Sequence, residues 1–289
     1  MPLRRTARRR ALSRFGELEI VTPLARGGMG GVYLAEDVET GERVALKVLD
    51  PQFANYPEVV ARLDSECALA SRVKHPGLLD IRAARRSIDD VPYLVMEYLR
   101  GETLAAIADR GALEQPLAIA LCAQVASALA ALHEAGVVHC DVKPENVFVL
   151  EDTIDGWPRV KVIDFGVSRA LDELPDEATV AGTPWCMAPE QWRGRPVPAS
   201  DVYALGCMLY DLITGHPPFD GSLPELMLAH LEQRPARPSW LVQLPGALER
   251  LILHALAKEP ELRPTMAQVA HELVLLADGC APDQLRAVG

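Results

Sequence analysis

The 289-residue chain lacks the cysteine patterns of a zinc site or a disulfide framework. Its six cysteines include no C-x-x-C pair and no Cys/His cluster, so neither kind of cross-link is indicated. They stand at positions 67, 122, 140, 186, 207 and 280. Thiols in this pattern fit a reducing compartment best, and we therefore expect a cytoplasmic protein.

Long apolar runs and an excess of positive charge are also missing. The longest apolar stretch, Pro116 to Leu132, contains Gln124 and Ser127 and is shorter than the roughly 20 residues that a membrane span needs, so it predicts a buried helix and no membrane span. The net charge of −11 argues against broad nucleic-acid affinity, because phosphate binding needs a basic surface. With 49% hydrophobic and 24% charged residues, the composition is that of a soluble globular chain.

Positive charge is concentrated in residues 1–14. This segment has few apolar anchors and lacks the apolar core of a signal peptide, so we expect a mobile basic arm. The arm could dock to an acidic partner or a membrane surface, although a solvated tail without a specific role is the favoured alternative. Its arginines are Arg4, Arg5, Arg8, Arg9, Arg10 and Arg14.

Two regions of different pattern follow the arm. From Phe15 to Glu97, short β-rich segments alternate with turn signals, and one helix is predicted over residues 58–73, where His75-Pro76-Gly77 stops it. Beyond Gly101 the pattern changes to long segments rich in Ala and Leu, which indicate helices over 116–134, 201–214 and 248–258. The expected fold class is α+β, with a β-rich part followed by a mostly helical one.

The most informative segment is residues 139–146, with the sequence HCDVKPEN, and Asp164-Phe165-Gly166 follows eighteen residues after its end. Phosphoryl transfer requires a positioned hydroxyl, bound metal and phosphates, and neutralisation of developing charge, which these residue types can supply. Two solvated turn aspartates are the alternative, and the joint spacing disfavours it. The expected roles are Asp141 for the hydroxyl proton, Lys143 for the γ-phosphate, and Asn146 and Asp164 as ligands of Mg²⁺.

This segment resembles the catalytic loop of eukaryotic-like Ser/Thr protein kinases of the bacterial type. Further motifs follow in the family's order: residues 24–32 resemble the glycine-rich loop, 44–47 the third-strand lysine motif, and 188–190 the end of the activation segment. The resemblance covers roughly residues 15–278. It implies a two-lobed protein kinase fold, with a small lobe at 15–97, a hinge at 97–100, a large lobe at 101–278 and a tail at 279–289. ATP would lie between the two lobes.

The resemblance also implies how the phosphates of ATP are held. Gly27, Gly28 and Gly30 would let the backbone approach phosphate closely, although a glycine-rich turn by itself could be an ordinary hairpin. Lys47 would hold the α- and β-phosphates and would pair with Glu66 in the predicted helix. The neighbouring acidic residues at 58 and 64 are rival partners, but the family register favours Glu66.

The adenine ring is expected to lie among apolar residues, each of which could instead be simple core. The backbone groups of Glu97 and Leu99 would hydrogen-bond the adenine edge. The apolar positions that match the family are Leu24, Val32, Ala45, Met96 and Phe148.

Specificity and anchoring residues are implied in the same way. Thr183 would brace Asp141 and Lys143, which is the pattern of Ser/Thr rather than tyrosine kinases. Asp201, which could be only a residue of a helix N-terminus, would anchor the catalytic-loop backbone. Glu190 and Arg263 resemble a buried ion pair that secures the activation segment.

Three positions depart from the family pattern. Ala25 stands where the first loop glycine is usual, and Cys186 where tyrosine is usual. Cys140 stands where the family usually has the arginine that receives an activation-loop phosphate, so we expect activity without phosphorylation of Thr179. A redox switch between Cys140 and Cys186 is a competing hypothesis, which requires a thiol of depressed pKa.

These observations together predict a Ser/Thr protein kinase that transfers the γ-phosphoryl group of MgATP to Ser or Thr hydroxyls of proteins, itself included, with Mn²⁺ as a possible substitute for Mg²⁺. A pseudokinase scaffold is disfavoured because the five residues expected at the phosphates and the hydroxyl are all present. A small-molecule kinase is disfavoured by Thr183 and the segment 188–190. Many bacterial members continue into a membrane helix and a sensor region, so the chain is either a stand-alone kinase or a fragment.

Overall fold

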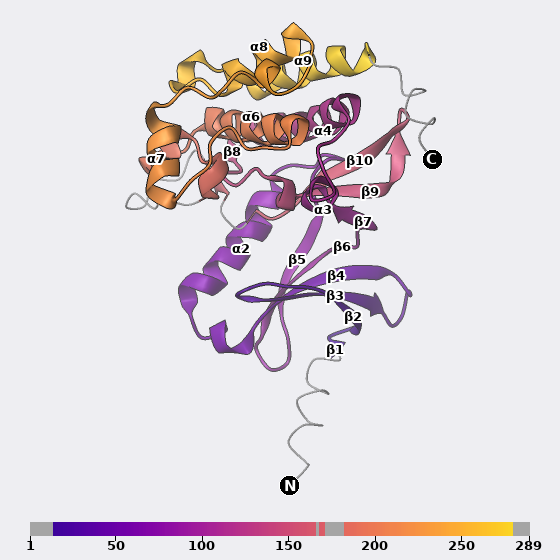
Figure 1. Cartoon of the computed structure of the whole chain (residues 1–289). Helices are drawn as coiled ribbons and strands as arrows, with labels where there is room; N and C mark the ends of the chain where they lie inside the picture. Colours follow the sequence, from indigo (N-terminus) through magenta and orange to yellow (C-terminus); the bar gives the residue numbers. More distant parts are fainter. Residues whose placement is uncertain (1–13, 166–167, 171–181, 280–289) are drawn as a thin grey trace. The chain divides into compact units, whose positions relative to one another are not determined.

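A computed structural model of the chain describes residues 14–165, 168–170 and 182–279, which divide into two compact units (Figure 1). Unit 1 contains the described residues up to Lys74 together with Leu79–Leu99. Unit 2 contains His75–Leu78 and the described residues from Arg100 onward. The expected basic arm, apart from Arg14, and the tail beyond Gly279 lie outside the described residues.

Unit 1 is built on a six-stranded antiparallel sheet in the order β1-β2-β3-β4-β6-β5. Its core contains a cluster around Phe15, Leu46 and Tyr93, in which the rings of Phe15 and Tyr93 meet edge to face at 4.9 Å. The strands are β1 (Arg14–Phe15), β2 (Leu18–Arg26), β3 (Gly30–Asp37), β4 (Arg43–Leu49), β5 (Ile81–Arg86) and β6 (Pro92–Glu97).

One α-helix, α2 (Pro57–Ser71), packs against β5 and β6 among the described residues of unit 1, after the short 3₁₀ helix η1 (Pro51–Phe53). It buries Val60, Leu63 and Leu69, which follow helical spacing. The helix ends at Ser71, two residues before the predicted end at Val73, and the N–H of Arg72 closes its last turn by donating to the carbonyl of Leu69 at 3.1 Å.

Unit 2 begins with short strands that frame the catalytic-loop segment. Strands β7 (Gly101–Thr103), β9 (Val147–Ile154) and β10 (Trp157–Val162) form a three-stranded sheet in the order β10-β9-β7. Strands β8 (Val137–Val138) and β11 (Arg169–Ala170) form a separate antiparallel pair. Residues 139–146 therefore run from the end of β8 to the start of β9, through the 3₁₀ helix η2 (Pro144–Asn146).

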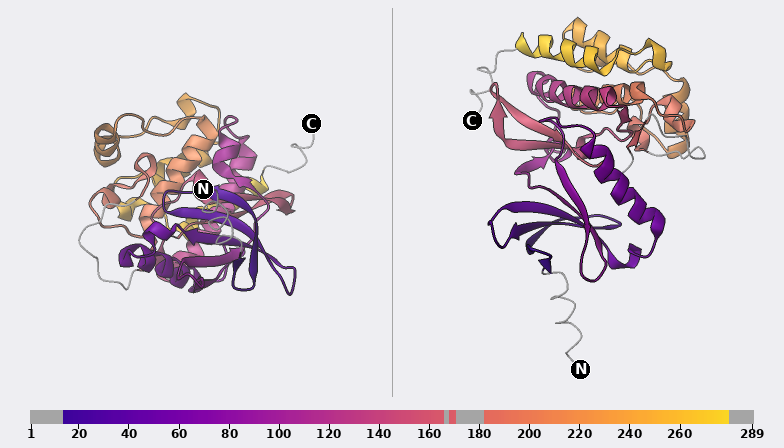
Figure 2. Two further views of the ribbon diagram at one scale, coloured as in Figure 1. Left: turned by 90° about the horizontal axis from the view of Figure 1, so that it is seen from below. Right: turned by 180° about the vertical axis from the view of Figure 1, so that it is seen from behind.

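The rest of unit 2 is helical, and α4 contacts α6, α9 and β10. Figures 1 and 2 show α9 lying along α4. The helices are α3 (Leu104–Ala108), α4 (Gln115–Glu134), α5 (Pro189–Trp192), α6 (Pro198–Thr214), α7 (Leu223–Glu232), α8 (Gly246–Ala255) and α9 (Met266–Asp278), and the further 3₁₀ helices are η3 (Pro184–Cys186), η4 (Pro238–Trp240) and η5 (Pro260–Leu262). The predicted α+β class is confirmed.

The helix α4 corresponds to the apolar stretch that predicted a buried helix. Among the described residues it is the one helix long and apolar enough to span a membrane, and 61% of its most apolar window is buried inside the structure. Ala126 and Leu129, for example, are fully buried. Its apolar character is therefore accounted for by packing within unit 2.

The boundaries of α6 and α8 also differ from their predictions. Helix α6 begins at Pro198, three residues before the predicted start, because proline suits the first helical position and Ser200 Oγ accepts the N–H of Val197 at 3.0 Å. It ends as predicted at Gly215, whose φ of +75° is costly for other residues. Helix α8 ends at Ala255 instead of Lys258, since a turn and η5 follow.

Candidate active site

Lys47 and Glu66 form an ion pair within unit 1. Lys47 lies on β4, and its Nζ donates to Oε1 and Oε2 of Glu66 on α2, each at 2.8 Å. Glu66 is only 3% exposed, so its carboxylate depends on compensating contacts of this kind. The rival residues Glu58 and Asp64 lie on the exposed face of α2. The structure therefore brings together the lysine and the acid that the family register favoured.

The glycine-rich segment forms the turn between β2 and β3 and lines a cavity of about 260 Å³, to which Lys47 also contributes. Gly30 is required by the fold itself, because a Cβ there would lie 2.1 Å from the carbonyl oxygen of Val48. At Gly28 a Cβ would meet nothing within 4 Å, and the backbone has no positive φ. Neither packing nor backbone conformation therefore requires glycine at position 28. A ligand that binds backbone N–H groups at close range would require it, because a side chain would obstruct those groups.

The expected adenine residues are divided between the two units. Ala45 and Met96 are buried and face each other across β4 and β6, while Leu24 is exposed and Val32 half-buried. Glu97 donates its N–H to the Asp80 carbonyl at 3.0 Å and Leu99 is half-buried; both belong to unit 1. Phe148 belongs to unit 2, where it lies half-buried on β9 opposite Thr103.

Asp141 is held by three side chains within unit 2. Thr183 Oγ1 donates to its Oδ1 at 2.6 Å, and Lys143 Nζ and Asn146 Nδ2 contact its Oδ2 at 2.8 and 3.0 Å. Lys143 Nζ also donates to Thr183 Oγ1 at 2.7 Å, so the hydroxyl lies between the acid and the lysine. Asp141 is buried, and the arrangement fixes the direction in which its carboxylate points.

Lys143 keeps its charge in this arrangement. Burial alone would lower its pKa, but the hydrogen bond and the attraction to Asp141 outweigh burial and leave the pKa raised above the ordinary value. A lysine that stays protonated can neutralise negative charge that develops beside Asp141.

Asp201 anchors the backbone just before Asp141. Its Oδ2 accepts the N–H of His139 and its Oδ1 the N–H of Cys140, both at 2.8 Å, and His133 Nε2 lies 2.8 Å from Oδ2. Cys140 has a φ of +67°, and left-handed backbone of this kind costs a residue other than glycine of order 1–3 kcal/mol. Asp201 is therefore an anchor of strained backbone and more than a residue of a helix N-terminus.

Asp164 follows the end of β10 and has left-handed backbone with a φ of +66°. The N–H of Ile163, directly before it, donates to the carbonyl of Asn146 at 2.8 Å, which ties the two predicted metal-ligand segments together. Gly166 lies outside the described residues. Within the parts of the chain that the structure describes, no three His, Cys, Asp or Glu side chains gather in a metal-binding group.

Comparison with known proteins decides the family. The protein kinase domain family matches residues 18–275, which is most of the chain. The chain belongs to the protein kinase family. It is 40% identical over 260 residues to Serine/threonine-protein kinase Pkn1 of Myxococcus xanthus, covering 86% of this chain and 36% of that protein.

Two further relatives of this kinase domain give the same result. Serine/threonine-protein kinase PrkC of Bacillus subtilis is 38% identical over 251 residues, which cover 85% of this chain and 38% of that protein. Serine/threonine-protein kinase PknB of Mycobacterium tuberculosis is 38% identical over 272 residues, which cover 90% of this chain and 43% of that protein. The chain thus spans well under half the length of these relatives.

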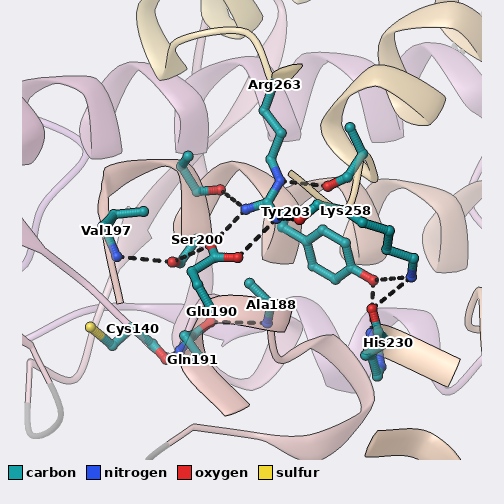
Figure 3. A network of polar contacts seen from close by, with 12 residues as sticks. Cys140, Ala188, Glu190, Gln191, Val197, Ser200, Tyr203, His230, Lys258 and Arg263 are labelled. Atoms are coloured by element: carbon teal, nitrogen blue, oxygen red, sulfur yellow. Dashed lines mark hydrogen bonds and ion pairs between the residues drawn. The ribbon is translucent and has the colours of Figure 1, made fainter. Parts of the chain in front are cut away.

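The expected ion pair that secures the end of the kinase activation segment is present (Figure 3). Arg263 donates to Oε1 and Oε2 of Glu190 at 2.6 and 2.9 Å, and Ser200 Oγ donates to Glu190 Oε1 at 2.6 Å. The Arg263 guanidinium lies 4.9 Å from the ring centroid of Tyr203 and its side chain is fully buried. The contact is bidentate, which is the strongest arrangement of this pair of groups.

Cys140 and Cys186 of the kinase domain are both buried. Burial raises the pKa of each thiol well above its ordinary value, and the charge of Asp201 raises that of Cys140 further. Thiols in such surroundings are mostly protonated and unreactive, which disfavours the hypothesis of a redox switch. Thr179, whose phosphorylation we expect to be unnecessary for activity, lies outside the described residues.

Sequence reasoning missed two contributors to the site. His133 on α4 reaches Asp201 across 68 positions in the chain, and Gln191 on α5 donates to the carbonyl of Cys140 across 51 positions. Neither residue stands in one of the motifs that resemble the kinase family. The only sequence signal was indirect, since Gln191 directly follows the segment 188–190.

Proposed function

We propose that this chain is a Ser/Thr protein kinase domain that transfers the γ-phosphoryl group of MgATP to serine and threonine hydroxyls of proteins, its own among them. The observation that carries the proposal is the arrangement of Asp141, Lys143 and Thr183 around a single carboxylate. Protein substrates and a cytoplasmic location belong to the same proposal; an acidic partner of the basic arm stays a prediction.

Asp141 would accept the proton of the substrate hydroxyl. Its Oδ1 already accepts from Thr183 and its Oδ2 is held by Lys143 and Asn146, so the carboxylate need not reorganise when a hydroxyl arrives. Lys143, kept protonated by Asp141, would neutralise charge on the phosphoryl oxygens. General base catalysis of this kind contributes roughly 10²–10⁴-fold to the rate.

The residues present fit a nucleotide and a divalent cation. Gly28 leaves bare backbone beside a cavity, and Lys47, oriented by Glu66, can contact phosphate oxygens. Asn146 uses its amide nitrogen on Asp141, which directs its Oδ1 to other ligands, and Asp164 supplies a carboxylate. MgATP held by these residues would supply the phosphoryl group, and its metal would supply positive charge to the phosphate oxygens.

The pseudokinase alternative rests on the same fold without catalysis. It is disfavoured because Lys47, Glu66, Asp141, Asn146 and Asp164 are all present, and because Asp141 is braced for proton transfer where a scaffold would need no such arrangement. An assay of phosphoryl transfer distinguishes an active kinase from a pseudokinase.

The test is transfer from γ-labelled ATP to a generic protein rich in Ser, Thr and Tyr, followed by phosphoamino-acid analysis. We expect phosphoserine and phosphothreonine with negligible phosphotyrosine, because Lys143 and Thr183 beside Asp141 shape a site for a short hydroxyl side chain. Asp141→Asn serves as the background control. Dominant phosphotyrosine would refute the substrate class, and a chain that binds MgATP yet transfers nothing would be a pseudokinase.

A further inference from the structure

The backbone of Cys140 is strained and directly precedes the proposed base. Its φ of +67° needs support from the surrounding structure, because left-handed backbone is unfavourable for a residue with a Cβ. Asp201 holds the preceding peptide, through the N–H of Cys140 at 2.8 Å. The peptide between Cys140 and Asp141 has a long contact on its amide side, where the N–H of Asp141 donates to His139 Nδ1 at 3.3 Å, so a short contact on its carbonyl side would fix its orientation and with it Asp141.

Gln191 holds the carbonyl side (Figure 3). Its Nε2 donates to the carbonyl oxygen of Cys140 at 2.8 Å, and the residue is 3% exposed. The bond lies in a buried environment, where removing the donor would leave a buried carbonyl without this partner.

The same carboxamide also holds the loop that carries Thr183. Its Oε1 accepts the N–H of Ala188 at 3.1 Å, just after η3. Gly182, which precedes Thr183, packs directly on the bond: a Cβ there would lie 3.1 Å from the carbonyl oxygen of Cys140 and 3.2 Å from Gln191 Nε2. Three segments of unit 2 therefore meet at one side chain.

We propose that Gln191 is a positioning residue for Asp141, whose carboxamide holds the strained Cys140 peptide from its carbonyl side and couples it to the loop of Thr183. The inference rests on the proposed kinase function. Its consequence is that loss of the Nε2 donor shifts Asp141 and Thr183 together, which lowers kcat and leaves nucleotide affinity near that of wild type, since these two residues are expected at the substrate hydroxyl and not at the nucleotide.

The variant that tests this is Gln191→Glu, which keeps the size of the side chain and replaces the donor by an oxygen. At pH 8 a carboxylate would face the carbonyl of Cys140, and we expect kcat to fall roughly 10–100-fold with KM for ATP unchanged. Burial raises the pKa of such a carboxyl group, so lowering the pH from about 8 to about 6 should protonate it and restore a donor. The ratio of variant to wild-type kcat should therefore rise as the pH falls.

The matched control is Gln124→Glu. Gln124 on α4 makes the same two-sided contact, with Nε2 donating to the carbonyl of Pro158 at 2.8 Å and Oε1 accepting from the N–H of Val160 at 3.2 Å, on β10 and away from residues 139–146. We expect it to lose thermal stability in the same way but to keep its kcat within about threefold of wild type at every pH.

The possible outcomes distinguish a positioning role of Gln191 from a purely structural one. A pH-dependent loss of kcat in Gln191→Glu and not in Gln124→Glu supports the role of Gln191, whereas wild-type kcat, or an equal and pH-independent loss in both variants, overturns it. If Gln191→Glu does not fold, Gln191→Met and Gln124→Met are compared in the same assay, without the pH arm.

If the wild-type chain transfers no phosphate, the proposed function has failed and hydrogen exchange followed by mass spectrometry decides on Gln191. Residues 139–141 and 182–188 should then exchange faster in Gln191→Glu than in wild type and in Gln124→Glu. Unchanged exchange in these two segments overturns the positioning role.

Discussion

In unit 1 the residues expected at the phosphates are one ion pair and a glycine-rich turn that lines a cavity, whereas in unit 2 Asp141 is held by three side chains. The first arrangement leaves room for a ligand, and a Cβ at Gly28 would meet nothing. The second fixes a geometry before any ligand arrives. The difference shows that the part expected to bind is left adaptable, while the part expected to do chemistry is built in advance.

The largest effect should come from the fixed part, through Asp141→Asn. An amide cannot accept the hydroxyl proton, so we expect transfer to fall by roughly 10²–10⁴-fold or more, with nucleotide affinity near that of wild type because the base would contact the substrate hydroxyl and not the adenine. Single-turnover transfer and equilibrium binding of a fluorescent nucleotide measure the two quantities. Equal losses of transfer rate and of nucleotide affinity would show that Asp141 contributes to nucleotide binding as well as to catalysis.

Lys47→Met breaks the ion pair of unit 1, and we expect it to lower both the transfer rate and the stability. This change removes the ammonium that Glu66 contacts, so transfer should be abolished and the chain destabilised. Breaking a fully buried pair costs about 3–5 kcal/mol, and solvent screening reduces this to about 1–3 here because the Lys47 side chain is 33% exposed. Denaturant unfolding gives the stability. The double variant Lys47→Met/Glu66→Met should recover stability but not transfer, and recovery of transfer would contradict the role of Lys47.

Arg263→Met breaks the buried ion pair with Glu190 in unit 2, and we expect it to lower stability more than it lowers the transfer rate. Arg263 is fully buried and donates to Glu190 and to the carbonyls of Ala199, Ala257 and Lys258. We expect a loss of about 3–5 kcal/mol in the free energy of unfolding, because Glu190 would stay buried with its charge. Ser200→Ala, which removes a hydrogen bond to the same carboxylate and the contact from the N–H of Val197, should cost less, about 1.5–3 kcal/mol. Equal losses would mean that the ion pair contributes little.

Local patterns predicted the parts of this site that lie in continuous motifs. Lys47 stands in a β-rich segment and Glu66 in a predicted helix, where periodicity alone left the acidic residues at 58 and 64 as rivals and the resemblance to the kinase family selected Glu66. Contacts such as that of Gln191 with Cys140 join residues 51 positions apart and leave no periodicity to read. The left-handed backbone of Cys140 was equally hidden, because cysteine, unlike glycine, does not mark such a position.

The smallest effect should come from Thr179→Ala. Asp141 is already held by Thr183, Lys143 and Asn146, and Cys140 offers a phosphate only a buried, neutral thiol where an arginine could make a charge-assisted contact. The fixed geometry of unit 2 should therefore not depend on an activation-segment phosphate, and we expect the variant to keep kcat within about threefold of wild type.

Phosphatase-treated wild type and Thr179→Ala should be assayed side by side, with Thr183→Ala as the variant expected to be damaged, because it removes the hydroxyl between Asp141 and Lys143. A large loss of rate in both the treated enzyme and Thr179→Ala would mean that another basic group receives the phosphate. In that case phosphorylation of the activation segment would be needed to complete the active geometry around Asp141. The fixed geometry of unit 2 would then be a property of the phosphorylated protein and not of the unmodified one.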